Sequence, residues 1–200
     1  MTASASPATA TVPRPGRQRS EAADEAILEA TLAVLAEQGY TGLTMAAVID
    51  RARVSSATLY RRYTTKIELV TAAIASLLPE PVDTDTGTFE GDLGAFIRHV
   101  AQSIERRNER AVQALRLEKE RDPELHTCLR ERFLAPRLTE LKAILGRAKK
   151  RGEIDTVPPV DVALSLVTGP LYHRAYHLDE PLTPAFVKNT IAFAVRALRA

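Results

Sequence analysis

Apolar residues recur every three or four positions along most of the chain, which is the spacing of one face of an α-helix. The first such stripe consists of Ala23, Ile27, Ala30 and Val34. Ser20 before it is a suitable N-cap, and the glycine at position 39 is a suitable terminator. We therefore predict a first helix over residues 20–38.

Two short helices are predicted next. Thr44 is placed to cap the first, and Ser55 is placed to cap the second. The chain breaks between them at Arg53 and Val54. The second short helix extends to about Arg62, because a new helix start follows directly.

That new start is a capping box, in which Thr65 is followed three residues later by Glu68. The helix that it opens is closed by Pro79 and Pro81. Residues 79–91 are rich in Pro, Asp, Thr and Gly, so they are interpreted as a linker.

Every segment beyond the linker again has helical period. The predicted helices begin near Leu93, near Val112 and at Pro123, and two more cover residues 160–177 and 184–198. No alternating run of useful length predicts a strand. The fold class is all-α, with about nine helices.

Proline and glycine mark the ends of these C-terminal helices. The pairs Asp122-Pro123 and Thr183-Pro184 are each a cap followed by a favoured first residue. Pro136 is expected to kink or divide its helix, and Gly152 is expected to end it.

Four parts of the chain follow from this pattern. They are a disordered basic tail (1–19), a helix-turn-helix head (20–78), the linker (79–91) and a larger C-terminal domain (92–200). The tail carries Arg14, Arg17 and Arg19 and no acidic residue, a charge that suits an anionic partner.

Composition limits the function only weakly. The 200 residues are 45% hydrophobic, enough to bury a core, and the net charge of +2 neither favours nor excludes nucleic acid. One cysteine permits no internal disulfide. Without a signal peptide or a membrane-spanning run, we expect a soluble cytoplasmic protein, although the acid-free first 19 residues also fit a transit peptide.

Catalytic signatures are missing from the sequence. It contains no Gly-rich phosphate loop, no nucleophile motif and no paired carboxylates in an apolar setting. We therefore expect neither an enzyme nor a cofactor. His173 and His177 have the spacing of a metal-binding pair, but with no third ligand in sight no metal site is predicted.

The segment from Arg51 to Lys66 carries five cations and no anion. Two short helices braced by a longer one are the layout of a helix-turn-helix, whose second helix enters the major groove. The alternative is an exposed helix that merely carries solvated cations. The small residues Ser55, Ser56 and Ala57 favour DNA binding, because they let the backbone approach closely.

The order of residues is more specific than the charge. The stretch GYTGLTMAAVIDRARVSSATLYRRYTTKIELV resembles the DNA-binding region of the TetR family of bacterial regulators. The matching positions are Gly39, Tyr40, Thr44, Val54, Ser55, Thr58, Leu59, Tyr60, Tyr63 and Lys66. The resemblance covers about residues 21–78.

This resemblance implies a sequence-specific DNA-binding homodimer, and the family tendency favours a repressor that a small molecule releases from operator DNA. Thr44, Tyr60 and Lys66 match family positions that hold phosphates. Base selection is assigned to exposed residues of the second short helix, and we expect at least one of its two arginines to read bases. The full predicted DNA-binding set is Thr44, Ser55, Ser56, Ala57, Thr58, Tyr60, Arg61, Arg62 and Lys66.

Two positions depart from the family pattern. Arg53 stands where a glycine usually makes the turn, and Ala57 stands where glycine is frequent. If Arg53 adopts a positive φ, it costs about 1 kcal/mol and adds a charge directed at phosphate. Otherwise the turn differs from that of the family.

The second half, notably RDPELHTCLRERFLAPR and GPLYHRAYHLDEPLT, resembles the C-terminal domain of one actinobacterial TetR subgroup. By resemblance it holds an effector pocket, and its last two helices form the dimer interface. The candidate pocket residues are Phe96, His99, His126, Cys128, Tyr172, His173, Tyr176 and His177.

The last helix supports the dimer independently. One stripe consists of Val187, Ile191, Ala194 and Leu198, and another of Phe186, Thr190 and Phe193. One face can thus meet the core and the other a partner. The alternatives are a wholly buried helix in a monomer and, for the whole chain, a helical ligand-binding or protein-interaction module without operator binding.

Overall fold

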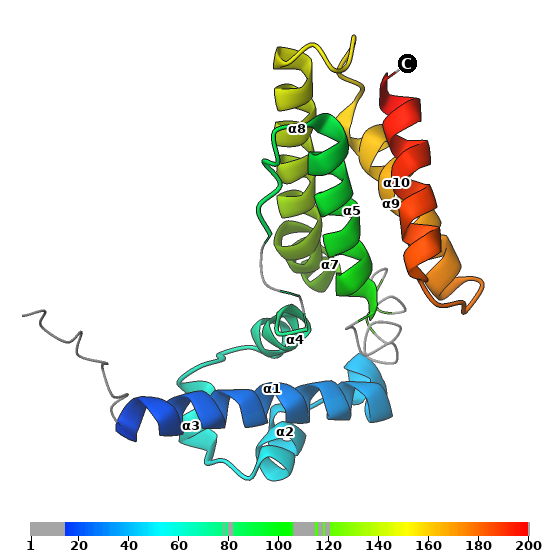
Figure 1. The fold of residues 1–200 in the computed structure, drawn as a ribbon. Helices are drawn as coiled ribbons and strands as arrows, with labels where there is room; N and C mark the ends of the chain where they lie inside the picture. The colour runs from blue at the N-terminus through cyan, green and yellow to red at the C-terminus, as the bar shows by residue number, and fades with distance from the viewer. Residues whose placement is uncertain are drawn as a thin grey trace, which may run out of the picture.

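The computed structural model describes residues 15–77, 79, 82–105, 115, 118 and 121–199. Every regular element in these ranges is helical, which confirms the all-α fold class (Figure 1). The helices form a head from the first part of the chain and an upright group of longer helices beyond it. The C-terminus lies at the end farthest from the head.

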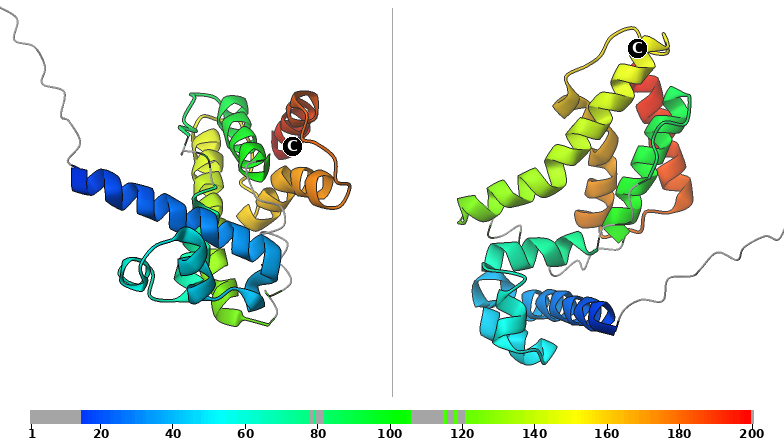
Figure 2. Two further views of the ribbon diagram at one scale, coloured as in Figure 1. Left: turned by 90° about the horizontal axis from the view of Figure 1, so that it is seen from below. Right: turned by 90° about the vertical axis from the view of Figure 1, so that its left-hand side faces the viewer.

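The head contains α1 (Pro15–Gly42), α2 (Met45–Ala52), α3 (Ser56–Tyr60) and α4 (Lys66–Ala75). Their buried faces share one core, which includes Ile27, Leu35, Val48, Leu59 and Leu69. The long α1 crosses beneath α4 and beside α2 and α3 (Figures 1 and 2).

The first helix differs from the prediction at its N-terminus. It begins at Pro15, so Ser20 lies inside the helix and is not its N-cap, and residues 15–19 are helical in backbone. Proline is favoured at the first helical position because its φ is already helical and it needs no N–H partner there. The rest of the predicted tail, residues 1–14 with Arg14, lies outside the described residues.

Gly39 ends the regular part of α1, as predicted. Its φ of 72° and ψ of 177° break the helix before a last turn over residues 40–42. Glycine adopts this conformation without the steric penalty that a β-carbon brings.

The larger group contains α5 (Phe89–Glu105), α7 (Pro123–Leu129), η1 (Arg130–Leu134), α8 (Ala135–Lys150), α9 (Val160–Tyr176) and α10 (Pro184–Arg199). Helices α5, α8, α9 and α10 enclose a second core. The helix predicted near Val112 falls outside the described residues, except at Leu115 and Glu118.

Several predicted helix ends are confirmed here. An oxygen of Asp122 accepts the N–H of Leu125 at 2.9 Å, and the hydroxyl of Thr183 accepts that of Phe186 at 3.3 Å. Gly152 ends α8 with a φ of 71°. The short π-helical segment η1 ends two residues before Pro136, whose missing N–H interrupts the α-helical ladder.

α5 begins at Phe89, inside the segment predicted as a linker. Phe89 is fully buried in the C-terminal core, and its N–H donates to a carboxylate oxygen of Glu153 at 2.7 Å. Burial of this ring favours the earlier start.

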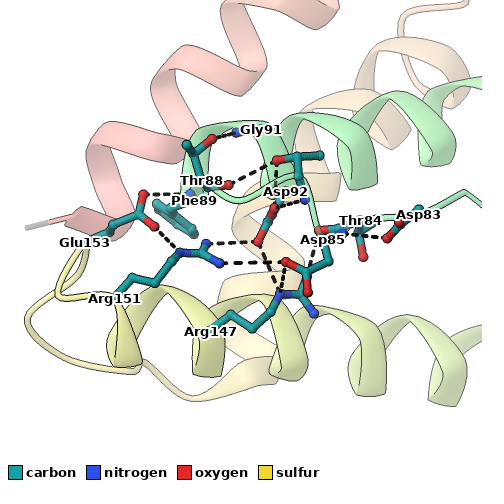
Figure 3. A network of polar contacts seen from close by, with 11 residues as sticks. Asp83, Thr84, Asp85, Thr88, Phe89, Gly91, Asp92, Arg147, Arg151 and Glu153 are labelled. Carbon is teal, nitrogen blue, oxygen red and sulfur yellow. Dashed lines mark hydrogen bonds and ion pairs between the residues drawn. The ribbon is translucent and has the colours of Figure 1, made fainter.

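A polar network around Asp92 holds the start of α5 against the end of α8 (Figure 3). The fully buried Asp92 accepts hydrogen bonds from Thr86 N at 2.7 Å, from Thr86 Oγ1 at 2.8 Å and from Arg151 Nη2 at 3.0 Å. Arg147 adds a contact of 3.3 Å and also donates to the carbonyl of Thr84 at 2.7 Å. Burial alone would raise the pKa of Asp92, but these hydrogen bonds outweigh it and the pKa is lowered.

Candidate nucleic-acid interface

The turn between α2 and α3 has the geometry of a helix-turn-helix. Thr44 caps α2 by accepting the N–H of Ala47 at 3.1 Å, as predicted. Arg53 then adopts a left-handed conformation, with φ 54° and ψ 41°, and its N–H caps the helix at the carbonyl of Ile49. An arginine therefore occupies the conformation for which the family usually has glycine.

α3 is five residues long and is held by one buried side chain. Leu59 is fully buried in the head core. Ser55 caps the helix at Thr58 N, and the two hydroxyls lie 2.8 Å apart. These contacts fix the helix from its inner side.

The outer side of α3 faces solvent. Ser56, Ala57 and Arg61 are exposed, and half of the Tyr60 surface is accessible. α3 thus presents small residues, a phenol and a cation together, a combination that suits a phosphate backbone and base edges.

The five cations of this region differ in their contacts. Arg51 forms an ion pair with Glu37 at 2.6 Å. Arg53 and Arg61 are exposed, and their side chains make no hydrogen bond or ion pair within the described part of the chain. These two arginines are therefore available to an external anion.

Arg62 is directed into the protein. Its side chain is only 14% exposed, its Nη1 donates to the carbonyl of Thr58 at 3.0 Å, and its Nε lies 3.5 Å from a carboxylate oxygen of Asp24 on α1. The structure thus separates the two arginines that the sequence left equivalent. Arg61 faces outward, and Arg62 braces α3 against α1.

Tyr63 makes a similar brace. Its hydroxyl donates to Asp24 at 2.9 Å. Burial, followed by this hydrogen bond, raises the pKa of Tyr63 to about 12. The end of α3 is therefore tied to α1 by two side chains that share one carboxylate.

Lys66 is the first residue of α4. The predicted capping box is present beside it, since Thr65 accepts the N–H of Glu68 and Glu68 accepts that of Thr65. The ammonium of Lys66 lies 4.3 Å from the ring centre of Tyr40 and 3.5 Å from the carbonyl oxygen of Thr41. Burial lowers the pKa of Lys66.

The contacts that join the head to the C-terminal domain are not predictable from the sequence. The Tyr40 hydroxyl donates to Asp122 at 3.1 Å, and the Thr41 hydroxyl donates to Glu118 at 3.1 Å. These partners are 82 and 77 residues apart in sequence. A helical period carries no signal for such pairs, and only the cap function of Asp122 was predictable.

Four candidate pocket residues lie at the C-terminal core. Phe96 is fully buried, and both Tyr172 and Tyr176 pack against the same cluster, with their rings stacked at 5.8 Å. His99 is half-buried, and its Nδ1 has no hydrogen-bond partner among the described residues. Burial lowers the pKa of His99, while Glu140 of α8 acts in the opposite direction and Arg137 of α8 in the same one. Arg137 Nη1 donates to the Tyr172 hydroxyl at 2.6 Å.

The other candidates lie elsewhere. His126 and Cys128 belong to α7, which packs on the head, and the Cys128 sulfur lies 3.8 Å from the hydroxyl of Thr71 in α4. His173 and His177 are exposed, with rings stacked at 5.4 Å. The described residues contain no group of three potential metal ligands.

Two surface cavities border the C-terminal core. One of 530 Å³ lies between α5 and α10 and is lined by Arg98, Ala101, Val187 and Ile191 among others. A smaller cavity of 240 Å³ includes Tyr176 beside Glu105. Tyr176 is therefore the one candidate pocket residue that lines either of these two cavities.

α10 confirms one of its two predicted stripes. Val187, Ile191, Ala194 and Leu198 are buried in the core. The second stripe is not a free face, because Thr190 is also buried and Phe186 is half-buried under the Arg174 guanidinium, 4.6 Å from the ring centre. Phe193 alone of that stripe is exposed, at 67%.

α9 supplies further exposed apolar surface. Val162 and Leu166 are 58% and 44% exposed. They lie four residues apart and so share one side of the helix.

The helices of the described residues were also compared with the length and hydropathy that a membrane span requires. None of them meets both requirements.

Comparison with known proteins agrees with this geometry. The family model for bacterial regulatory proteins of the tetR family matches residues 27–73, and the model for the tetracyclin repressor-like C-terminal domain matches residues 83–194. The chain belongs to the TetR family of bacterial regulators. It is thus a DNA-binding transcriptional regulator, and residues 27–73 include the whole helix-turn-helix.

Individual relatives extend over most of the chain. An uncharacterized HTH-type transcriptional regulator of Mycobacterium bovis, Mb1581, is 35% identical over 82% of each chain. The DNA-binding transcriptional repressor TetR of Mycobacteroides abscessus is 32% identical over 86% of this chain and 92% of its own. The solved structure of the flavonoid-responsive regulator FrrA has a TM-score of 0.68 at 24% identity, over 88% of this chain and 94% of that one.

Proposed function

We propose that this TetR-family regulator is a homodimeric repressor that binds operator DNA through α3 and leaves it when a small molecule binds the C-terminal domain. In this proposal residues 20–78 are the DNA-binding head, residues 79–91 the connection, and residues 92–200 the effector and dimerisation domain. Because it acts on DNA, we place it in the bacterial cytoplasm.

The observation that carries the proposal is the orientation of α3. Leu59 anchors the inner side of the helix in the head core, while Ser56, Ala57, Tyr60 and Arg61 face outward. A short helix with this division can enter a major groove without disturbing the head core. Lys66 at the start of α4 and Thr44 at the start of α2 are assigned to phosphates.

A dimer fits the exposed apolar side chains of the last two helices. Val162, Leu166 and Phe193 give α9 and α10 an apolar surface that a second copy of the chain can cover. Two heads in one dimer would then read half-sites about one helical turn apart.

The effector region is assigned to the C-terminal core around Phe96, His99, Tyr172 and Tyr176. The Tyr172 hydroxyl, which Arg137 contacts, and the His99 Nδ1, which has no partner in the described part of the chain, offer polar groups amid apolar ones, as small-molecule sites do. The similar structure FrrA is described as flavonoid-responsive. A polyphenol is therefore a reasonable first ligand to test here.

The proposal is tested by binding of the purified protein to the DNA immediately upstream of its gene, compared with a random duplex of equal length. Arg61→Ala should weaken binding to upstream DNA more than to random DNA, because an arginine on a guanine edge discriminates by roughly 1 to 3 kcal/mol. Lys66→Ala should weaken both about equally. Equal affinity of the wild type for both duplexes would favour the alternative, a helical module without operator binding.

A further inference from the structure

Lys66, to which a phosphate contact is assigned above, already has an internal site. The ammonium of Lys66 lies over the Tyr40 ring at 4.3 Å and near the Thr41 carbonyl at 3.5 Å. Burial lowers the pKa of Lys66, while the carboxylates of Asp122 and Glu118 act in the opposite direction. The cation is therefore stabilised by an aromatic face, a carbonyl and two nearby negative charges.

Tyr40 and Thr41, which form this site, are both hydrogen-bonded to the C-terminal domain. Asp122 Oδ2 accepts the hydroxyl of Tyr40, and its other oxygen, Oδ1, caps α7 at Leu125. Glu118 accepts the hydroxyl of Thr41. A phenol that donates to a carboxylate has a more electron-rich ring, which strengthens its attraction for an ammonium. Asp122 thus links the first turn of α7 to the environment of Lys66.

We propose that Asp122 and Glu118 compete with DNA phosphate for Lys66, so that the position of the first turn of α7 determines how strongly the head binds DNA. This inference rests on the proposed phosphate contact of Lys66. A lysine has one positive charge. The negative field of the two nearby carboxylates opposes that charge, so the net electrostatic attraction of this site for a DNA phosphate is weaker. Moving α7 toward or away from Tyr40 changes that field, which couples the C-terminal domain to DNA affinity.

Asp122→Asn is the decisive variant. Asparagine caps a helix as well as aspartate and can still accept the Tyr40 hydroxyl, so the variant removes the charge and little else. Its affinity for a short random-sequence duplex, measured by fluorescence anisotropy, should be roughly three to ten times tighter than that of the wild type at low salt. The gain should shrink as salt rises, because the competing charges are partly exposed.

Two comparisons separate local competition from general charge. Asp155→Asn makes the same change in net charge at the exposed segment after α8, at the opposite end of that helix from the head, and should leave affinity unchanged (Figure 1). In a Lys66→Ala background, Asp122→Asn should bring no gain. Glu118→Gln should tighten binding in the same direction as Asp122→Asn.

The opposite results are equally clear. Unchanged or weaker binding of Asp122→Asn, or an equal gain in the Lys66→Ala background, would overturn the competition. If Lys66→Ala by itself binds the duplex like the wild type, the phosphate role of Lys66 is wrong and the competition falls with it. If Lys66→Ala weakens DNA binding but Asp122→Asn leaves it unchanged, the phosphate role of Lys66 stands and only the competition is refuted.

Discussion

Replacing Asp92 by asparagine tests the network that joins α5 to α8. The side chain is fully buried and accepts hydrogen bonds from Thr86, Arg147 and Arg151. Asparagine has the same shape, so the change removes a charge without leaving a cavity. Two arginine side chains then lose their buried counter-ion.

The expected loss of stability depends on how far Arg147 and Arg151 are exposed to solvent. Breaking a fully buried ion pair costs about 3 to 5 kcal/mol. Arg147 and Arg151 are 27% and 28% exposed, and Asp85 lies 3.4 Å from Arg147 as a remaining partner. Water and Asp85 should therefore recover part of the loss. We expect Asp92→Asn to lower the free energy of unfolding by about 2 to 3 kcal/mol at pH 7.

The pH dependence has a definite sign. The pKa of Asp92 is lower in the folded protein than the value of about 3.9 for an unfolded aspartate. Its stabilisation is therefore complete above that unfolded value and is lost as pH falls through the lowered folded pKa. The stability gap between wild type and Asp92→Asn should be equal at pH 7 and pH 5 and should close in more acid solution, below about pH 4.

Urea unfolding followed by far-UV circular dichroism measures both effects, at one fixed protein concentration because the proposed dimerisation would add to apparent stability. Asp85→Asn is the matched control. That carboxylate touches the same two arginines but is 60% exposed, so its loss should cost less than about 1 kcal/mol. Equal stability of the two variants, or a stability gap between wild type and Asp92→Asn that stays constant down to the most acid solution, would refute the role assigned to the Asp92 charge.

Three further variants test the head and the dimer. Phe193→Glu, on the exposed side of α10, should give monomers by light scattering at micromolar concentration, and a dimer there would contradict the assigned interface. Arg62→Ala should destabilise the head by about 1 kcal/mol, since Thr58 and Asp24 lose a buried donor, while sequence preference stays as in the wild type. A relaxed preference would make Arg62 a base reader after all. Arg53→Gly should raise the free energy of unfolding by about 0.5 kcal/mol, because relief of the left-handed strain is partly offset by a more flexible unfolded chain. The same variant should weaken DNA binding. Unchanged affinity would mean that Arg53 touches no phosphate.

Local signals in the sequence predicted much of the head. Thr44, Ser55 and the Thr65–Glu68 box are caps whose partners lie three residues away, so the chain itself encodes them. Gly39 was predictable in the same way, because its backbone conformation is one that few other residues adopt.

Contacts between distant segments were not predictable. The inward orientation of Arg62 depends on Asp24, two helices earlier, and the environment of Lys66 depends on Asp122. Periodicity shows which face of a helix is buried but not which helix covers it. For the same reason the second stripe of α10 was misjudged, since Thr190 and Phe186 are covered by neighbours that a single helix cannot reveal.

The way in which α3 is held from its inner side has an evolutionary consequence. The side chains of Ser56, Ala57, Tyr60 and Arg61 form no hydrogen bond, ion pair or ring contact within the described part of the chain, so substitutions there scarcely touch the folding of the head. Leu59, Ser55 and Arg62 hold the helix from within. Descendants of one gene can therefore evolve new target sequences by substitution of a few exposed residues of α3, while the core of the head stays unchanged. Duplicated copies can diverge in DNA specificity without first losing stability.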